Sequence, residues 1–254
     1  MPNVVCIIPA RMASSRFPGK PLAPIMGLPM IEHVRRRVAL CDWLAAVVVA
    51  TCDEEIRRVV EEAGGHVIMT KSVHERCTDR IAEAADGLKA DIVVNVQGDE
   101  PMVLPRMLQE VAAPLLRDPA LPAANLATEI EGPEEFADPN APKLVANLAG
   151  DILYVSREPI PSRKKAGTDA YRKLKQLGII AFRSDFLQSF SKLAATPLEQ
   201  IESVDMLRAI EHGYRVRVVV TKGRMIGVDR PEDVARVEQA LATDPLVARY
   251  LRLA

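Results

Sequence analysis

The chain has 254 residues, of which 48% are hydrophobic and 26% are charged, and its formal net charge at pH 7 is −1. This is an ordinary globular balance, and such a charge gives no general attraction to nucleic acid or to a membrane surface. Four scattered cysteines without a CxxC pair, and no leader or apolar run of about 20 residues, predict a reduced, cytoplasmic protein with no nucleic-acid or membrane partner.

Short apolar, β-branched runs alternate with amphipathic helical stretches in the first half of the chain. The runs are almost continuously apolar, which is typical of parallel strands that are buried on both faces. The resulting βαβαβ order predicts an α/β fold with right-handed crossovers and a mainly parallel central sheet. The predicted strands are residues 4–8, 46–51, 66–69 and 92–96, and the predicted helices are residues 30–41, 54–64 and 78–88.

The second half of the chain is less regular. It contains no repeat and no low-complexity linker, so we expect one domain over residues 1–254, with a small inserted lobe at about residues 125–180. Pro231 is predicted to occupy the first position of the last helix, where its missing N–H costs nothing. The predicted helices are residues 104–116, 198–211 and 231–241, and the predicted extended segments are residues 123–129, 144–156, 177–182 and 216–220.

The loop after the first predicted strand carries the strongest functional signal. Arg11, Arg16 and Lys20 fall within ten residues, together with two serines and a glycine. The loop follows a strand, and open α/β folds bind ligands at the carboxyl ends of their strands. A triphosphate needs cations and backbone N–H donors at this density, because its charge must be compensated as it leaves water. The alternative is a solvated loop with incidental arginines, since the segment matches neither GxxxxGK[ST] nor GxGxxG.

Two aspartates are expected at the same rim of the sheet. Asp99 follows the strand at residues 92–96, and Asp229 lies between the strand at residues 216–220 and the last predicted helix. Hard oxygen ligands suit Mg²⁺, which usually takes one or two protein carboxylates and fills its other positions with phosphate oxygens and water. The alternatives are a turn aspartate for Asp99 and a helix N-cap for Asp229.

The loop sequence IPARMASSRFPGKPL resembles the opening motif of the 3-deoxy-manno-octulosonate cytidylyltransferases, or CMP-Kdo synthetases. The resemblance covers nearly the whole chain, and it implies a Rossmann-like nucleotidyltransferase fold. It also implies transfer of CMP from CTP to a small anionic acceptor with release of pyrophosphate, by a protein that commonly forms a homodimer. Further matches follow in order: VNVQGDEP at 94–101, YVSR at 154–157, PIP at 159–161, LGI at 177–179, PLE at 197–199, Glu202, LR at 207–208, and GVDRPED at 227–233.

The family pattern implies a role for each matching residue. Asp99 and Asp229 would bind Mg²⁺, and Arg11, Arg16 and Lys20 would be catalytic, because they would stabilise charge on the α-phosphate and on the leaving pyrophosphate. The implied nucleotide-binding residues are Pro9, Ala10, Arg11, Ser14, Arg16, Lys20, Thr78, Arg80, Gln97 and Asp99. The implied acceptor-binding residues are Gln97, Arg157, Gln176, Ile180, Glu199 and Glu202.

Two segments depart from the family pattern. Residues 74–80 read HERCTDR where the family has HxSGT[DE]R, so Arg76 and Cys77 replace two small residues and must alter the adjoining wall. Residues 175–183 read KQLGIIAFR where the family has RH[IL]GIY[AG]YR, with a histidine and a tyrosine that are expected to contact the sugar acid. Gln176 cannot carry that charge and Ile180 cannot hydrogen-bond, and an unpaired buried hydroxyl costs about 1–3 kcal/mol.

These departures leave other functions open. Residues 163–175 contain six cations and a single carboxylate, that of Asp169. This segment is either a solvated basic loop or part of a site suited to a smaller, more highly charged acceptor such as phosphonoformate. A sugar-1-phosphate nucleotidylyltransferase is a further alternative, although the two arginines before residues 18–20 disfavour it. A non-catalytic nucleotide-binding protein is the last alternative, but it would not need both metal-binding aspartates.

Overall fold

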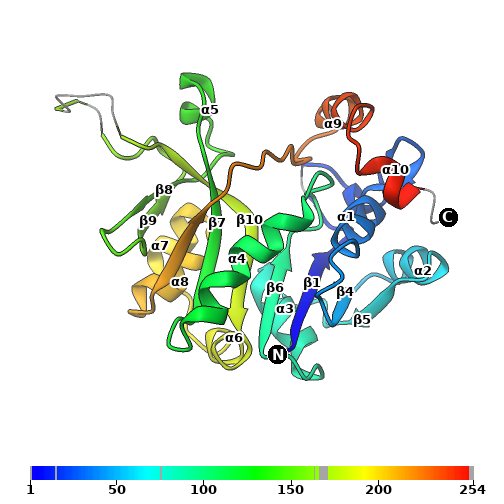
Figure 1. Ribbon diagram of the computed structural model, residues 1–254, viewed down its shortest axis with the longest axis horizontal. Coiled ribbons are helices and arrows are strands. Elements are labelled where there is room, and N and C mark those ends of the chain that lie inside the picture. The colour runs from blue at the N-terminus through cyan, green and yellow to red at the C-terminus, as the bar shows by residue number, and fades with distance from the viewer. Residues whose placement is uncertain (1, 15, 75, 163, 166–170, 252–254) are drawn as a thin grey trace.

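A mainly parallel sheet with helices on both faces forms the centre of the protein (Figure 1). The computed structural model describes residues 2–14, 16–74, 76–162, 164–165 and 171–251. Seven strands of this nine-stranded sheet run in the order β11-β7-β10-β6-β1-β4-β5, and β8 (Lys143–Ala146) and β9 (Ile152–Ser156) join it where β8 pairs with β10. The seven strands are β1 (Val4–Ala10), β4 (Ala46–Thr51), β5 (His66–Met69), β6 (Ile92–Val96), β7 (Ala123–Glu129), β10 (Leu174–Arg183) and β11 (Val216–Val220).

The pairing of the strands confirms the predicted fold class. β1 pairs in parallel with β4 and β6, β4 pairs in parallel with β5, and β11 pairs in parallel with β7. β10 is antiparallel to both of its neighbours, β6 and β7. The seven residues of β1 are all buried, as its apolar sequence requires of a strand that is covered on both faces.

Alternating residues of β1 enter two hydrophobic cores, one on each face of the sheet. Cys6 and Ile8 belong to the core that α1, α2 and α4 cover, whereas Val5 and Ile7 belong to the core that α3, α6 and α8 cover. Burial of each such aliphatic side chain contributes roughly 1.5–3 kcal/mol, so the two cores hold the sheet rigid. The covering helices are α1 (Met30–Val38), α2 (Glu54–Glu62), α3 (Cys77–Asp86), α4 (Pro105–Arg117), α6 (Ser184–Phe190) and α8 (Met206–Glu211).

Several predicted elements differ from the observed ones, because the chain turns inside them or because they begin at another residue. The helix predicted at residues 198–211 is two helices, α7 (Pro197–Glu202) and α8, because Ser203 adopts a left-handed conformation with φ 52°. The last predicted helix begins at Asp233, so Pro231 precedes α9 (Asp233–Leu241) instead of opening it. The extended segment 144–156 is a hairpin of β8 (Lys143–Ala146) and β9 (Ile152–Ser156), whose turn contains Gly150 at φ 82°.

The helix at residues 133–137 and several short elements near the ends of the chain were not predicted. α5 (Pro133–Ala137) and the β8–β9 hairpin extend from the β7 and β10 side of the sheet, away from β4 and β5 (Figure 1). The lobe expected at about residues 125–180 includes β7 and β10, which both belong to the central sheet. No helix among the described residues is long and apolar enough to cross a membrane. The other short elements are η1 (Lys20–Leu22), β2 (Pro24–Ile25), β3 (Leu28–Pro29) and α10 (Val247–Tyr250).

Candidate active site

The loop after β1 is held in a defined conformation by its own backbone and by a distant aspartate. Gly19 has φ 73°, which glycine adopts without strain, and its N–H donates to Met12 O over 3.1 Å. Met12 N in turn donates to Asp53 Oδ2 over 2.8 Å, from the residue that precedes α2. The predicted cationic loop is therefore anchored at the carboxyl end of β1, and its Ser15 lies outside the described residues.

Two cations of this loop pair with the two aspartates that were predicted to bind metal. Lys20 Nζ lies 2.6 Å from Asp99 Oδ2 and also donates to Val228 O over 2.9 Å. Arg16 Nη2 lies 2.9 Å from Asp229 Oδ1. Because Lys20 is mostly buried and Arg16 is half exposed, the first pair is screened less by solvent than the second. The fold thus brings together cations and carboxylates that lie up to 213 residues apart in the chain.

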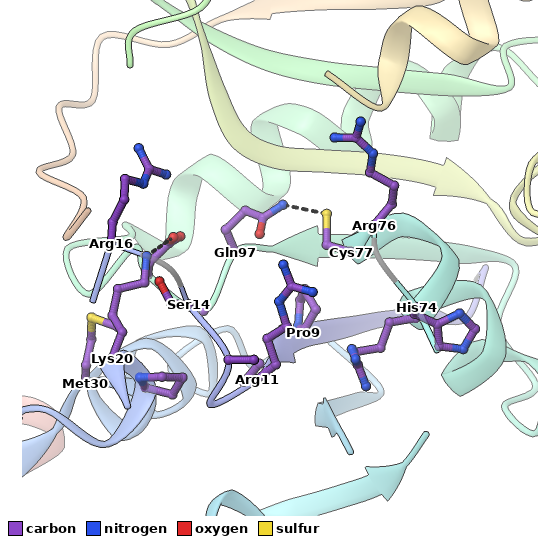
Figure 2. Close-up of a pocket in the computed structure, with 16 residues that line it drawn as sticks. Pro9, Arg11, Ser14, Arg16, Lys20, Met30, His74, Arg76, Cys77 and Gln97 are labelled. Carbon is purple, nitrogen blue, oxygen red and sulfur yellow. Dashed lines mark hydrogen bonds and ion pairs between the residues drawn. The ribbon is translucent and has the colours of Figure 1, made fainter. Parts of the chain in front are cut away.

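Nine of the ten predicted nucleotide-binding residues line one cavity of about 280 Å³. In Figure 2 Gln97 lies between Lys20 on one side and Cys77 on the other, at the end of β6. The tenth, Thr78, is fully buried behind the wall and donates through Oγ1 to Asp205 Oδ2 over 2.7 Å. The nine lining residues are Pro9, Ala10, Arg11, Ser14, Arg16, Lys20, Arg80, Gln97 and Asp99.

The two aspartates that were predicted to bind Mg²⁺ lie on neighbouring segments. Val228 N donates to Asp99 O over 3.0 Å, which places Asp229 beside Asp99. Burial, and then the charge of Asp99, raise the pKa of Glu100 to about 8, and Asp229 adds to the rise. No group of three or more His, Cys, Asp or Glu side chains in the described residues could hold a metal ion. Two carboxylates beside a phosphate-sized cavity suit Mg²⁺, which fills its other positions with phosphate and water oxygens.

Two glycines, Gly98 after the end of β6 and Gly178 within β10, allow this close packing. A Cβ at Gly98 would lie 2.7 Å from Pro9 O, and a Cβ at Gly178 would lie 2.5 Å from Gln97 Cγ. A side chain at residue 98 would force the backbone to move, and one at residue 178 would displace the Gln97 side chain. The two glycines therefore let the segment that carries Gln97 and Asp99 pack closely against β1 and β10.

The predicted acceptor residues on α7 are engaged in internal contacts. Glu199 is 1% exposed and accepts two hydrogen bonds from Arg208, over 2.8 and 2.6 Å. Glu202 accepts from Tyr154 Oη over 2.7 Å and from Ser156 Oγ over 2.8 Å. Both carboxylates therefore position the α7–α8 segment in this conformation.

The other predicted acceptor residues lie on β10 and directly after β9, outside the lining of the cavity. Ile180 is 5% exposed and packs in the core on the α3 side of the sheet. Gln176 donates to Asn125 Oδ1 of the neighbouring β7. Arg157 follows β9 and donates through Nε to Glu202 O over 2.6 Å. Of the residues predicted to bind the acceptor, Gln97 lines the cavity.

The ionisation of Glu202 makes the stability of the fold depend on pH. Burial raises the pKa of Glu202, but hydrogen bonds from Arg157 N, Tyr154 and Ser156 outweigh it and lower the pKa below its ordinary value. A carboxyl with a lowered folded-state pKa stabilises the fold above its unfolded pKa of about 4.3, and this contribution is lost as pH falls through the folded value.

We therefore expect Glu202→Gln to lower the free energy of unfolding at pH 7, because an amide cannot accept all the hydrogen bonds that the carboxylate accepts. The difference from the unmodified protein should shrink as pH falls below about 4. Urea denaturation of both proteins at pH 7 and at lower pH measures this difference. A deficit that stays constant over that range would contradict the role assigned to the Glu202 carboxylate.

Comparison with known proteins identifies the family. The family model described as "Cytidylyltransferase" matches residues 5–222. The chain belongs to the cytidylyltransferase family. It is 43% identical over 249 residues to the 3-deoxy-manno-octulosonate cytidylyltransferase of Geobacter metallireducens, covering 94% of this chain and 98% of the relative. It is 46% identical over 245 residues to the enzyme of that name from Syntrophus aciditrophicus, covering 95% and 98%.

Solved structures agree with this assignment. A structure of CMP:2-keto-3-deoxy-manno-octonic acid synthetase complexed with CTP superposes with a TM-score of 0.88 at 41% identity, covering 94% of this chain and 98% of that one. The 4-diphosphocytidyl-2C-methyl-D-erythritol synthase of Anaerococcus prevotii, at 14% identity and a TM-score of 0.62, shares the fold. The predicted family, the nucleotidyltransferase fold and the enzyme class are therefore confirmed.

Some residues around the cavity were missing from the predicted site. Asp53 anchors the cytidylyltransferase loop at Met12, and Asn140 accepts from Arg16 Nη1 over 2.8 Å. Neither residue lies in a matched motif, so only the folded chain reveals these contacts. Arg76 and Cys77 both line the cavity, and their departure from the family motif was the available signal.

Proposed function

We propose that this cytidylyltransferase transfers CMP from CTP to 3-deoxy-manno-octulosonate with release of pyrophosphate, and that it requires Mg²⁺. The observation that carries this proposal is the set of cation–carboxylate pairs, Lys20 with Asp99 and Arg16 with Asp229, of which Lys20, Asp99 and Arg16 line one cavity. The acceptor follows from the names of the relatives, which are 43% and 46% identical over nearly the whole chain.

The acidic and the basic residues of the site have different proposed roles. Bound Mg²⁺ would polarise phosphate oxygens and neutralise part of their charge, with Asp99 and Asp229 as its protein ligands. Arg11, Arg16 and Lys20 would bind the triphosphate and stabilise the charge that develops on the pyrophosphate as it leaves. The attacking group is an oxygen of the acceptor, in line with the leaving pyrophosphate, so no side-chain nucleophile is needed.

A phosphonate acceptor is a second candidate, and one observation favours it. Ile180 is buried in the core and has no hydrogen-bonding group, and the Gln176 amide nitrogen already donates to Asn125. The basic segment at residues 163–175 gives the phosphonate candidate little support, because two of its cations are paired with carboxylates. Arg172 pairs with Glu129 and Lys175 with Glu135, while Arg163 and Asp169 lie outside the described residues.

An acceptor screen separates the two candidates. CTP and Mg²⁺ are held constant, and pyrophosphate release is measured with 3-deoxy-manno-octulosonate and, separately, with phosphonoformate. We expect robust turnover of the sugar acid. Turnover of phosphonoformate alone would replace the proposed acceptor with the phosphonate. Release that needs no acceptor would contradict both candidates.

We also propose that the chain is one domain that forms a homodimer through the region of β8, β9 and α7. Three large apolar side chains of this region are exposed: Leu148 in the β8–β9 turn, Leu153 on β9 and Ile201 on α7. Exposed apolar side chains gathered in one region are typical of an interface. Light scattering behind size-exclusion chromatography measures the mass directly, and a monomer at micromolar concentration would contradict the proposed dimer.

A further inference from the structure

Arg76 stands between two cavities of the protein. It precedes the first residue of α3, and it lines both the 280 Å³ cavity and a neighbouring cavity of about 790 Å³. In Figure 2 it extends on the Cys77 side of Gln97, opposite Lys20. Arg76 is therefore a cation at the end of the cavity remote from the Lys20–Asp99 pair.

Arg76 retains hydrogen-bonding capacity in the described structure. Its Nη1 donates to Ser203 Oγ over 2.7 Å, and its Nη2 reaches Glu199 O only at 3.5 Å. The nearest carboxylate oxygens, of Glu199 and Asp205, lie 3.8 and 3.9 Å away. A guanidinium carries five N–H donors, and the Arg76 side chain is 25% exposed. Several of its donors thus remain for a ligand.

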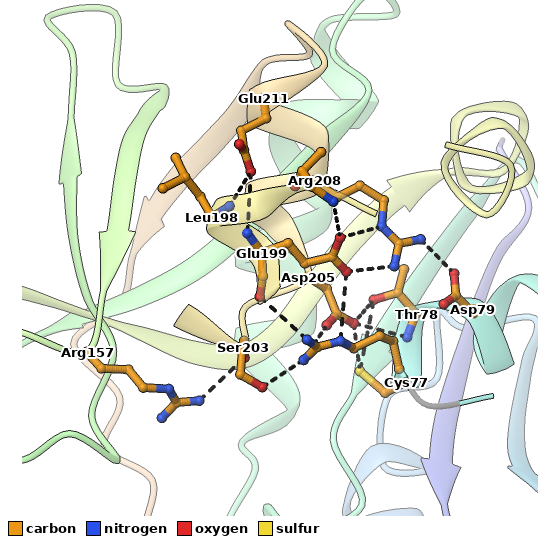
Figure 3. A network of polar contacts seen from close by, with 12 residues as sticks. Cys77, Thr78, Asp79, Arg157, Leu198, Glu199, Ser203, Asp205, Arg208 and Glu211 are labelled. Atoms are coloured by element: carbon orange, nitrogen blue, oxygen red, sulfur yellow. Dashed lines mark hydrogen bonds and ion pairs between the residues drawn. The ribbon is translucent and has the colours of Figure 1, made fainter. Parts of the chain in front are cut away.

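The short contacts to the carboxylates near Arg76 are made by other groups. Glu199 pairs with Arg208, and Asp205 Oδ2 accepts from both N and Oγ1 of Thr78, over 3.3 and 2.7 Å (Figure 3). Arg76 makes only long ion pairs with these two carboxylates, at 3.8 and 3.9 Å, so its charge is balanced in part while several of its N–H donors stay available. A partly exposed guanidinium with available donors is a strong binding group for carboxylate or phosphonate.

Cys77 connects this end of the cavity to Gln97. Its Sγ accepts from Gln97 Nε2 over 2.9 Å and donates to Asp205 Oδ2 over 3.4 Å. Burial raises the pKa of the Cys77 thiol well above its ordinary value, so the proton needed for the second contact is retained. The thiol thereby fixes the orientation of the Gln97 amide beside Arg76.

Arg157, which the sequence predicts to bind the acceptor, instead donates hydrogen bonds to the backbone of other residues. Its guanidinium donates to three backbone carbonyls, those of Glu202 at 2.6 Å, Pro139 at 2.8 Å and Ser203 at 3.4 Å. It therefore fastens the turn between α7 and α8. Arg76 approaches the same turn from α3, but with most of its donors unused.

We propose that Arg76 is a specificity-determining residue that binds the anionic group of the acceptor, beside a Gln97 amide held by Cys77. An acceptor anion must approach a triphosphate of like charge, so it needs a cation outside the group formed by Arg11, Arg16 and Lys20. Arg76 supplies that cation across Gln97. This inference rests on the proposed function and adds which group of the acceptor is recognised.

The test compares Arg76→Ser, Arg76→Lys and the control Arg58→Ser, which alters an exposed arginine on α2. Steady-state pyrophosphate release gives KM for CTP and for the acceptor separately. We expect Arg76→Ser to raise the acceptor KM at least about tenfold, with the CTP KM changed less than about twofold. Arg76→Lys should fall between, because lysine keeps the charge but lacks the planar fork. Arg58→Ser should match the unmodified enzyme.

Three results would overturn the inference. An acceptor KM that stays constant in Arg76→Ser would show that Arg76 does not bind the acceptor. An equal rise in both KM values would assign Arg76 to the nucleotide or to the fold. If Arg76→Ser does not fold, Arg76→Lys decides, through a rise in acceptor KM alone or its absence. If the unmodified enzyme turns over no acceptor, the proposed function is wrong. If the unmodified enzyme is active and Arg76→Ser leaves the acceptor KM unchanged, only the role proposed for Arg76 is wrong.

Discussion

Replacing Asp99 with asparagine should lower CTP-dependent pyrophosphate release by at least about 100-fold. The substitution removes the negative charge that pairs with Lys20 at 2.6 Å and that is proposed to bind Mg²⁺. The amide keeps the size of the side chain, so the local backbone has no reason to move. The loss should therefore appear in turnover and in the Mg²⁺ dependence rather than in the melting temperature.

The control is Asp42→Asn, which makes the same chemical change at an exposed position before β4. This variant should retain full activity. Titration of Mg²⁺ against both variants separates a metal-binding role from a pairing role, because only the former shifts the required Mg²⁺ concentration. Unchanged activity in Asp99→Asn would refute the assignment of Asp99 as a metal ligand.

Replacing Arg208 with leucine should lower the free energy of unfolding by about 3–5 kcal/mol. Arg208 and Glu199 form a buried pair with side-chain exposures of 6% and 1%. Arg208 also donates to Asp79 over 3.0 Å and lies 4.8 Å from the centre of the Phe190 ring. Its removal would leave the buried Glu199 carboxylate with only the long ion pair to Arg76 at 3.8 Å.

The matched control is Arg215→Leu, because Arg215 is half exposed and makes only long ion pairs, with Asp118 at 3.8 Å and with Asp151 at 3.9 Å. Exposed pairs contribute about 0–1 kcal/mol, so this variant should unfold nearly as the unmodified protein does. Urea denaturation of the two variants, analysed with a common slope, gives both values. Equal destabilisation by the two substitutions would contradict the structural role of the Arg208–Glu199 pair.

The parts of the fold that could be predicted are those in which local pattern and tertiary structure agree. The apolar run of β1 predicts a buried parallel strand, and it is one. The helix predicted at residues 198–211 fails because Ser203 has a left-handed backbone without a glycine to signal it. That turn is held by Arg76 and Arg157 from distant segments, and local periodicity carries no information about such contacts.

The same division holds for the candidate site. The loop from Arg11 to Lys20 and the aspartates at strand ends follow from topology, since the ends of parallel strands share one edge of a sheet. The acceptor side depends on how α7, β9 and β10 pack together. Glu199 matches the family motif, yet in this conformation its carboxylate is paired with Arg208. Motif position alone does not say whether a carboxylate faces a ligand or another side chain.

The most direct test of the account is to follow the α-phosphorus of CTP. The enzyme is incubated with Mg²⁺, α-³²P-labelled CTP and 3-deoxy-manno-octulosonate, and the products are separated and identified by mass. The account predicts that the label appears in a CMP–acceptor conjugate and that one pyrophosphate is released for each conjugate formed. Label that remains in CTP, or that appears only as free CMP without a conjugate, would contradict the assignment of this cavity as the site of CMP transfer.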